Sequence, residues 1–389
     1  MDRVLSLSKW ILILIIVLFL FLNQIPVFAE GTGDLPLKSE SAVLLDTETN
    51  AVLYGKNADE KMYPASVTKI ATAIYAIEKG DLDSIATVSA NAVRQDGTRV
   101  YLVEGEQVPL KKLIQGMLIN SGNDAAVAIA EQIDGSVDLF AEHINEYLKT
   151  VIGVKNTHFT NPSGLHDDNH YTTAMDLALI TNYAMKNPQF AEIFGTKRLH
   201  WEGQSWNTDL ITHHLMLKGE LPYAGITGGK TGYTTVSKQT LATTADNGNL
   251  KLTVIVLKSD QKRDKYDDTA ILFDYGFNEY VHSTLKHGEV YKSGDQEFLL
   301  DRDLLVTEDK SGIVKKVDST GRLSIENPNG QVLQVAQLKQ KEEPKPVKTS
   351  LKSSKSTNKQ EYAASYFWIF IVAAAAVLIG AGKKITGKM

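Results

Sequence analysis

The stretch Tyr63–Thr72, YPASVTKIAT, places a lysine three residues after a serine, and this pair could carry out nucleophilic chemistry. The spacing alone is not specific, because Ser-x-x-Lys occurs five times in the chain. The other four pairs begin at Ser6, Ser259, Ser283 and Ser356. They lie in an apolar leader, in turn-like stretches and in a polar tract. Only Ser66 opens an apolar helical pattern, so only Ser66 and Lys69 are predicted to be held in a fixed geometry.

A serine hydroxyl is a weak nucleophile until a base removes its proton. Lys69 could be that base if its amine is neutral. Residues i and i+3 of a helix share a face, so Lys69 would lie one turn beyond Ser66. The positive potential of the helix N-terminus would also disfavour a protonated amine there. The pair therefore predicts an acyl-transfer enzyme with Ser66 as nucleophile and Lys69 as base.

Two further motifs are needed to complete such a site. Ser121-Gly122-Asn123 lies in a break between two helical segments, and Lys230-Thr231-Gly232 lies just before a strand-like run. Neither motif is rare by itself. Ser-x-Asn also begins at Ser89, Ser205 and Ser356, and a Lys-Ser-Gly variant begins at Lys292 and Lys310. The prediction of catalysis rests on the order and setting of the three motifs, which are a helix start, an interhelix loop and a strand.

The elements that must position these motifs indicate an α+β fold. A hairpin is predicted around residues 47–50, and a helix from Pro64 to Lys79 closed by Gly80. Helical periodicity also covers 109–119, 123–133, 136–150 and 174–186. Strands are predicted at 238–246 and 250–259, followed by a closing helix at 266–280. Strands at both ends with helices between them indicate an antiparallel sheet with flanking helices and a helical subdomain.

The chain after this domain changes in character. Residues 286–336 alternate short β-favouring runs with turns, which predicts a small β-rich module. Residues 338–361 lose apolar side chains and gain Lys, Ser and Thr, which is typical of a disordered linker. Residues 363–382 carry no charge and could span a bilayer as a C-terminal transmembrane helix. Three lysines follow within residues 383–389 and predict a cytoplasmic tail.

The N-terminus and the charge distribution indicate an exported protein. Residues 1–29 have a charged start, an apolar core and small residues at the end, which predicts a cleaved signal peptide. An uncleaved anchor helix is the alternative. The chain has a net charge of -5, but residues 30–338 alone carry about -13, which argues against a nucleic-acid partner. There is no cysteine, so disulfides and thiolate chemistry are excluded.

The three motifs, in this order, resemble those of low-molecular-weight penicillin-binding proteins, which are serine-type D-alanyl-D-alanine carboxypeptidases. The resemblance covers about residues 35–282. It includes the nucleophile segment, the 156–180 segment NTHFTNPSGLHDDNHYTTAMDLALI, and the stretches GGKTGYT and DTAILFDYGF. It implies a transpeptidase and β-lactamase type of fold, and a catalytic domain on the extracellular face of the cell membrane. The implied substrate is a peptidoglycan stem peptide ending in D-Ala-D-Ala, and β-lactams would be covalent inhibitors. We expect no cofactor and no metal.

The resemblance also implies residue roles. Ser66 would attack the carbonyl between the two D-alanines, Lys69 would accept its proton, and Ser121 would relay a proton to the leaving group. Asn123 would orient Lys69 and the substrate. Backbone N–H groups of Ser66 and Tyr233 would form the oxyanion hole. The implied substrate-binding residues are Lys230, Thr231, Gly232, Tyr233 and Arg263. Arg263 could equally be a solvated charge.

Some features depart from the family pattern or favour other interpretations. THHLMLKG at 212–219 replaces an Asn-x-x-Leu-Leu-like stretch, and 234–245 lacks the usual glycine after the third motif.

His158, His166 and His170 lack the helical spacing of a zinc pair, and a polar loop is the preferred interpretation. His213 and His214 are expected to point apart on a strand, as surface or groove residues. Tyr171 and Asp176 are expected to support a loop.

Other functions remain open on the motifs alone. A class A β-lactamase needs an added glutamate, and no Glu-x-x-Leu-Asn segment lies between Asn123 and Lys230. A transpeptidase or endopeptidase would share all three motifs, because the acceptor is not encoded in them. An inert wall-binding scaffold is the alternative from a different class. The three intact motifs argue against it.

Overall fold

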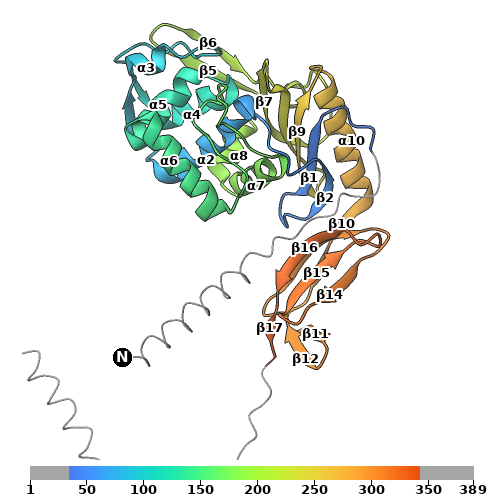
Figure 1. Cartoon of the computed structure of the whole chain (residues 1–389). Helices are drawn as coiled ribbons and strands as arrows, with labels where there is room; N and C mark the ends of the chain where they lie inside the picture. The colour runs from blue at the N-terminus through green and yellow to red at the C-terminus, as the bar shows by residue number, and fades with distance from the viewer. Residues whose placement is uncertain (1–34, 342–389) are drawn as a thin grey trace, which may run out of the picture. The chain divides into compact units, whose positions relative to one another are not determined.

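The computed structural model describes residues 35–341, which lie within one compact unit of the chain (Figure 1). Its centre is a five-stranded antiparallel sheet with the order β2-β1-β9-β8-β7. The strands are β1 (Ser41–Asp46), β2 (Val52–Lys56), β7 (Ile226–Thr234), β8 (Lys238–Asp246) and β9 (Lys251–Ser259). The predicted hairpin and two predicted strands are therefore confirmed. The third motif lies inside β7, not before a strand as predicted.

The central strands are apolar on both faces because both faces are covered. Leu44 and Val254 contribute to a core on the side of helix α10 (Asp264–Glu279), together with Phe273 of that helix. Their neighbours Val43 and Ile255 belong to the other core, on the side of the helical region. Successive strand residues point to opposite faces, so this alternation matches the period of a β-strand. The predicted antiparallel sheet with helices on its faces is confirmed.

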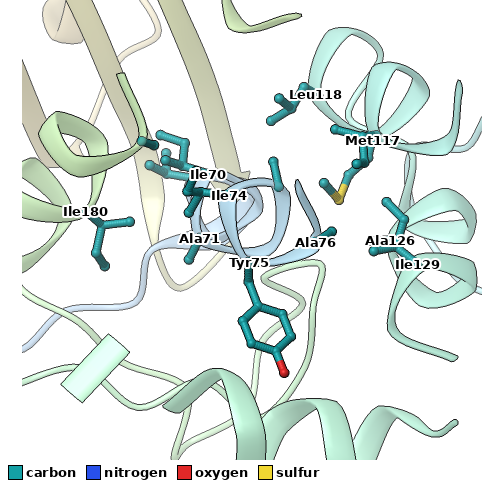
Figure 2. Packing of buried hydrophobic residues seen from close by; sticks show 14 of the residues in the cluster. Ile70, Ala71, Ile74, Tyr75, Ala76, Met117, Leu118, Ala126, Ile129 and Ile180 are labelled. Atoms are coloured by element: carbon teal, nitrogen blue, oxygen red, sulfur yellow. The ribbon is translucent and has the colours of Figure 1, made fainter. Parts of the chain in front are cut away.

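The helical region is built around one buried helix. Helix α2 (Lys69–Lys79) is buried over its first nine residues, from Lys69 to Ile77, as expected for a helix surrounded by other elements. Figure 2 shows Ile70, Ile74 and Tyr75 of α2 among side chains from its neighbours. Those neighbours are α4 (Leu110–Ile119), α5 (Asn123–Asp134), α6 (Val137–Tyr147), α7 (Ala174–Met185) and α8 (Pro188–Phe194). Alanines in α2 and α5 let the backbones approach closely.

Several short elements were not predicted, because runs of three to five residues carry little periodicity. They are β3 (Ile85–Thr87), α3 (Ala90–Val93), β4 (Gln107–Pro109), β5 (Arg198–Glu202), β6 (Asn207–Ile211) and α9 (Leu215–Lys218). Two predicted helices also differ in detail. The helix predicted from Pro64 begins with a 3₁₀ turn, η1 (Ala65–Thr68), and the one predicted to residue 150 ends in a π turn, η2 (Leu148–Ile152).

Beyond α10 the chain forms short antiparallel strands with a separate small core. The strands are β10 (Tyr280–Leu285), β11 (Val290–Ser293), β12 (Gln296–Leu299), β13 (Leu304–Asp309), β14 (Val314–Val317), β15 (Arg322–Glu326), β16 (Val332–Gln337) and β17 (Lys339–Gln340). Leu338 is buried in that core and β17 pairs with β12, so the predicted linker start at residue 338 is too early. The module contacts the sheet domain through Thr307, whose hydroxyl lies 2.6 Å from that of Thr49.

Four predicted segments lie wholly or mainly outside the described residues. They are the signal peptide at 1–29, the remainder of the linker to 361, the transmembrane helix at 363–382 and the tail at 383–389. Within residues 35–341, none of the helices combines the length and apolarity that crossing a bilayer requires.

Candidate active site

Ser66 lies in the short 3₁₀ turn η1, directly before α2, and this turn is strained. Ala65 has φ +51°, a left-handed conformation that is costly for a residue with a Cβ. Two side chains hold the turn. Thr68 donates its hydroxyl to the carbonyl of Ala65 at 2.9 Å, and Thr240 of β8 donates to the carbonyl of Pro64 at 3.0 Å. Ser66 itself remains partly accessible, as a nucleophile must be.

Lys69 is fully buried and its amine lies at the centre of the site. Its Nζ lies 3.2 Å from Ser66 Oγ, 2.7 Å from Asn123 Oδ1 and 2.5 Å from the carbonyl oxygen of Ser163. The last two atoms can only accept hydrogen bonds. A neutral amine has two N–H groups and one lone pair. If the two fixed acceptors take both N–H groups, the lone pair is left for the hydroxyl of Ser66, which is the arrangement that a base requires.

The surroundings of Lys69 favour this neutral form. Burial, followed by the positive charge of Lys230, holds the pKa of Lys69 well below its usual range. The carboxylate of Asp124 acts in the opposite direction, but more weakly. Asp124 is already engaged, since it accepts hydrogen bonds from the backbone N–H groups of Val100 and Leu102. Burial and the neighbouring cation therefore both favour a neutral Lys69 amine.

The carbonyl of Ser163 belongs to a tight loop, residues 161–165, that packs against the nucleophile turn. Asn161 Oδ1 accepts from the backbone N–H groups of Ser163 and Gly164, at 3.1 and 2.8 Å. Gly164 has φ +83°, and a Cβ there would overlap the carbonyl group of Ala65. Glycine is therefore required for both conformation and close approach. Pro162 accepts a hydrogen bond from Thr72 of α2, which fixes the loop to the same helix that carries Lys69.

His170 also supports the nucleophile turn. The N–H of Thr160 donates to its Nδ1 at 3.1 Å, so Nδ1 is the acceptor and Nε2 carries the proton. Nε2 lies 2.9 Å from the hydroxyl of Thr68, which in turn donates to Ala65. Burial lowers the pKa of His170 to about 3, so the ring is neutral at ordinary pH. Within residues 35–341 no three His, Cys, Asp or Glu side chains gather as metal ligands would.

The second motif lies where α4 gives way to α5. Ser121 has φ +62°, a second strained non-glycine position at the site. Its hydroxyl accepts a hydrogen bond from Lys230 Nζ at 3.0 Å. Asn123 begins α5, and its Nδ2 donates to the carbonyl of Asp96 at 2.6 Å, which directs Oδ1 towards Lys69. The structure therefore links the first, second and third motifs through Lys69, Asn123, Ser121 and Lys230.

The third motif occupies β7, the edge strand of the sheet. Lys230 is buried, and burial together with the charge of Lys265 lowers its pKa to about 7. A Cβ on Gly232 would overlap Thr240 Oγ1 and lie 2.9 Å from the backbone nitrogen of Ser66. This glycine thus allows β7 to pass close to the N–H of the nucleophile. Thr231 is half-buried, and Tyr233 is 62% exposed on the open side.

The structure does not bring Arg263 together with the other candidates. Its side chain is 66% exposed and forms an ion pair with Asp267 at 2.7 Å on α10. The cation that approaches the site from this helix is Lys265, which the sequence analysis missed. Lys265 is buried, and its Nζ donates to Gln239 Oε1 at 2.8 Å.

The two adjacent histidines do not lie on a strand, contrary to the prediction. His213 and His214 lie in the turn before α9. His214 is fully buried, caps α9 by accepting from Leu217 N–H, and contacts Thr243 Oγ1 at 2.8 Å. His213 is exposed. The expected supporting role of Asp176 agrees with its contacts, since it accepts from Asn156 N–H and from the Thr157 hydroxyl.

Comparison with known proteins gives a consistent result. Residues 29–261 match the family model Peptidase S11, described as D-alanyl-D-alanine carboxypeptidase. The chain is 32% identical over 303 residues to D-alanyl-D-alanine carboxypeptidase DacF of Bacillus subtilis, covering 74% of this chain and 75% of that one. A solved D-alanyl-D-alanine carboxypeptidase from Mycobacterium tuberculosis is similar with a TM-score of 0.60 and 28% identity. This match covers 64% of this chain and 96% of that one.

A longer structural match includes more of the chain. Penicillin-binding protein 5 from Haemophilus influenzae is similar with a TM-score of 0.68, covering 80% of this chain and 98% of that one. At 24% identity this match supports the fold alone. The fold is thus that of penicillin-binding proteins. The chain belongs to the D-alanyl-D-alanine carboxypeptidase family, peptidase S11.

Proposed function

We propose that the protein removes the terminal D-alanine from peptidoglycan stem pentapeptides through an acyl-enzyme on Ser66. This proposal rests on the contacts of the Lys69 amine. Asn123 Oδ1 and the Ser163 carbonyl accept hydrogen bonds from this amine, and Ser66 Oγ lies 3.2 Å from it. Family membership as a serine-type hydrolase agrees with this chemistry.

The first step is attack by Ser66 on the carbonyl carbon of the penultimate D-alanine. Lys69 takes the hydroxyl proton, and the carbonyl oxygen becomes an oxyanion. The backbone N–H groups of Ser66 and Tyr233 would stabilise that oxyanion, since β7 passes against the Ser66 nitrogen. As the tetrahedral intermediate collapses, the C–N bond breaks and the leaving amine takes the proton that Lys69 removed from Ser66, which leaves Lys69 neutral for the second step. Ser121, which accepts a hydrogen bond from Lys230, would relay this proton.

Lys230 would also bind the carboxylate of the leaving D-alanine, with Thr231 beside it. Its pKa of about 7 applies to the empty site, where burial disfavours the charge. A bound carboxylate favours the protonated form and raises that pKa. In the second step water, activated by Lys69, attacks the ester carbonyl, and Ser66 leaves with its proton restored. An amine acceptor in place of water would give transpeptidation from the same intermediate.

The position of β7 explains how an extended peptide would bind. An edge strand presents unpaired backbone N–H and C=O groups on its outer side. A stem peptide can add to this edge as a further strand, with its C-terminal carboxylate near Lys230. Gly232 and Tyr233 would then contribute backbone contacts more than side-chain contacts.

The wild-type protein is expected to remove one alanine from a stem pentapeptide, and Ser66→Ala is expected to abolish both this activity and covalent labelling by penicillin. The reason is that, among residues 35–341, only the hydroxyl of Ser66 lies within hydrogen-bond distance of the Lys69 amine. Mass analysis of the peptide measures the first effect and mass analysis of the protein the second. A cross-linked peptide product would instead indicate a transpeptidase. Wild-type labelling of Ser66→Ala would show that the nucleophile lies elsewhere, provided that the variant's circular dichroism spectrum is unchanged.

We also propose that the catalytic domain is exported by the leader and held at the membrane by residues 363–382. The apolar composition of these two segments and the lysines after the second support this. The described residues extend to Lys341, whose N–H donates to the Glu297 carbonyl. The shortened form should therefore end at Lys341, not earlier.

A form comprising residues 1–341 is expected to appear in the medium and to bind penicillin, whereas the full chain should sediment with membranes. Cell fractionation with a fluorescent penicillin measures both. If the shortened form sedimented with membranes as well, the leader or the folded domain would be the main attachment.

A further inference from the structure

An open cavity of about 520 Å³ lies beside the catalytic residues and has no role in the mechanism above. Its walls come from α3, from the last two turns of α5 and the start of α6, and from the loop 161–165. The side chains that give it its character are Asn91, Gln95, Glu131, Asp138, Asn161 and Leu165. We call it the α5 groove. No lysine or arginine is among the described residues that line it.

The α5 groove adjoins the active site on two sides, through residues that line it and contacts that their segments make with the catalytic residues. On one side, Ser163 lines the groove and also supplies the carbonyl that contacts Lys69. On the other side, Gln95 lines the groove, and the next residue, Asp96, accepts a hydrogen bond from Asn123. A peptide that reaches Ser66 between these two segments therefore has the groove next to it.

The dimensions of the groove match one particular part of a stem peptide. Glu131 follows Asn123 by eight residues of helix, which places it about 12 Å along the α5 axis. In a stem pentapeptide, the α-carbon of the third residue lies about 4 Å from that of the penultimate D-alanine, whose carbonyl Ser66 attacks. A lysine-type side chain adds about 6 Å, from bonds of about 1.5 Å each. Its terminal group can thus reach Glu131 while the D-alanine end occupies the catalytic site.

The chemistry of the groove is acidic at its far end. The carboxylate of Glu131 accepts from Ser89 Oγ at 2.6 Å and from Asn91 Nδ2 at 2.9 Å, which holds it in one orientation. Each carboxylate oxygen has a second lone pair available for a ligand. Asp138 is exposed on the first turn of α6. At the opposite end of the site, Lys230 and Lys265 provide positive charge. The two ends therefore suit a substrate with a carboxylate at one end and an ammonium at the other.

We infer that the α5 groove binds the third residue of the stem peptide and favours a side chain with a free ammonium group and no carboxylate. This inference rests on the proposed function. Glu131 and Asp138 also have local roles, because Glu131 anchors α3 and an acidic residue suits the start of α6. If these were their only roles, substituting either residue would change the stability of the protein but not its choice between substrates. The experiment must therefore measure substrate preference.

The test compares two pentapeptides, L-Ala-γ-D-Glu-L-Lys-D-Ala-D-Ala and the same peptide with the lysine Nε acetylated. Acetylation removes the charge and keeps the backbone. The wild-type protein is expected to release D-alanine from the free-lysine peptide with a kcat/KM about five- to tenfold higher at low salt, which is about two- to threefold from each of two exposed ion pairs. The preference should decrease as salt is added. Equal kcat/KM values would overturn the inference, whereas release from neither peptide would overturn the proposed function instead.

Two variants localise the preference. Glu131→Gln and Asp138→Asn are each expected to lower the ratio of the two kcat/KM values to about two- to threefold, and the double variant should bring it close to one. Glu142→Gln is the matched control, since it removes an exposed carboxylate from α6 outside the groove. It should keep the wild-type ratio. If the double variant kept that ratio at an unchanged Tm, or if Glu142→Gln lost it equally, the groove would not be the source of the preference.

Discussion

Lys69→Arg is expected to lower the second-order rate of Ser66 acylation by penicillin by about 10²–10⁴, the usual contribution of a general base. Arginine cannot lose its proton in a protein, so the variant has a permanent charge and no lone pair where wild-type Lys69 offers a neutral amine. The site around Lys69 Nζ already contains two acceptors, Asn123 Oδ1 and the Ser163 carbonyl. A guanidinium would satisfy both and present a third N–H to Ser66, which stabilises the hydroxyl in place of activating it.

Two arginine substitutions serve as controls for Lys69→Arg. Lys79→Arg changes an exposed residue at the end of the same helix and should leave acylation unchanged. Lys230→Arg should retain more activity than Lys69→Arg, because binding a carboxylate requires a cation and not a base. Acylation rates of all three variants between pH 6 and 10 provide the measurement. A rate for Lys69→Arg within about tenfold of wild type, or 1.4 kcal/mol in barrier, would mean that another group takes the Ser66 proton.

The pH profile of the wild-type enzyme follows from the same two lysines. Lys69 must be neutral, so acylation should fall as the pH drops through its lowered pKa. Lys230 must be protonated to bind a carboxylate, and its pKa in the free enzyme is about 7. Binding of carboxylate-bearing ligands to the free enzyme should therefore weaken above that pH.

Gly164→Ala is expected to lower acylation by about 10²-fold or more, although the residue has no side chain to lose. The added Cβ would overlap the carbonyl group of Ala65, and the φ of +83° is unfavourable for alanine. The loop 161–165 or the turn carrying Ser66 must therefore move. Either movement separates the Ser163 carbonyl or the Ser66 hydroxyl from Lys69, and displacements of about 1 Å can cost this much in rate.

Gly153→Ala separates the two causes in that experiment. Gly153 has φ +87°, so an alanine there suffers the same backbone strain, but its Cβ would meet no atom within 4 Å. It should lower the Tm without changing the acylation rate of the folded protein. Gly164→Ala should lower both. If Gly164→Ala acylated at the wild-type rate, the loop would be able to shift without disturbing Lys69, and its carbonyl would not be needed.

The sequence motifs predicted the reacting groups better than the groups that surround them. Ser66, Lys69, Ser121, Asn123 and Lys230 are brought together by the fold, as expected from helix starts and strand positions. The Ser163 carbonyl was not anticipated. A backbone oxygen has no sequence signature, and this one contacts a residue 94 positions away in the chain. Only the packing of the 161–165 loop against α2 defines it.

The sequence predicted Arg263 near the site, but the structure has Lys265 there, and this difference shows another limit of prediction from sequence. The two residues stand at the start of α10, and residues two apart on a helix point about 200° away from each other. Which of them faces the sheet depends on the angle at which α10 begins. The segment SDQKRDK contains three cations among other polar residues, and this pattern does not define that angle. In the structure Lys265 reaches Gln239 of β8, and Arg263 remains at the surface.

The exposed edge of the sheet has a consequence for the behaviour of the protein at high concentration. An unprotected edge strand can pair with the same strand of another molecule, which is a common start of aggregation. Strand β7 contains Gly228, Gly229 and Gly232, which lower its propensity to pair, and Tyr233 is followed by a polar turn rather than an apolar run. The composition of β7 therefore allows the edge to stay open to a short peptide while it disfavours self-association.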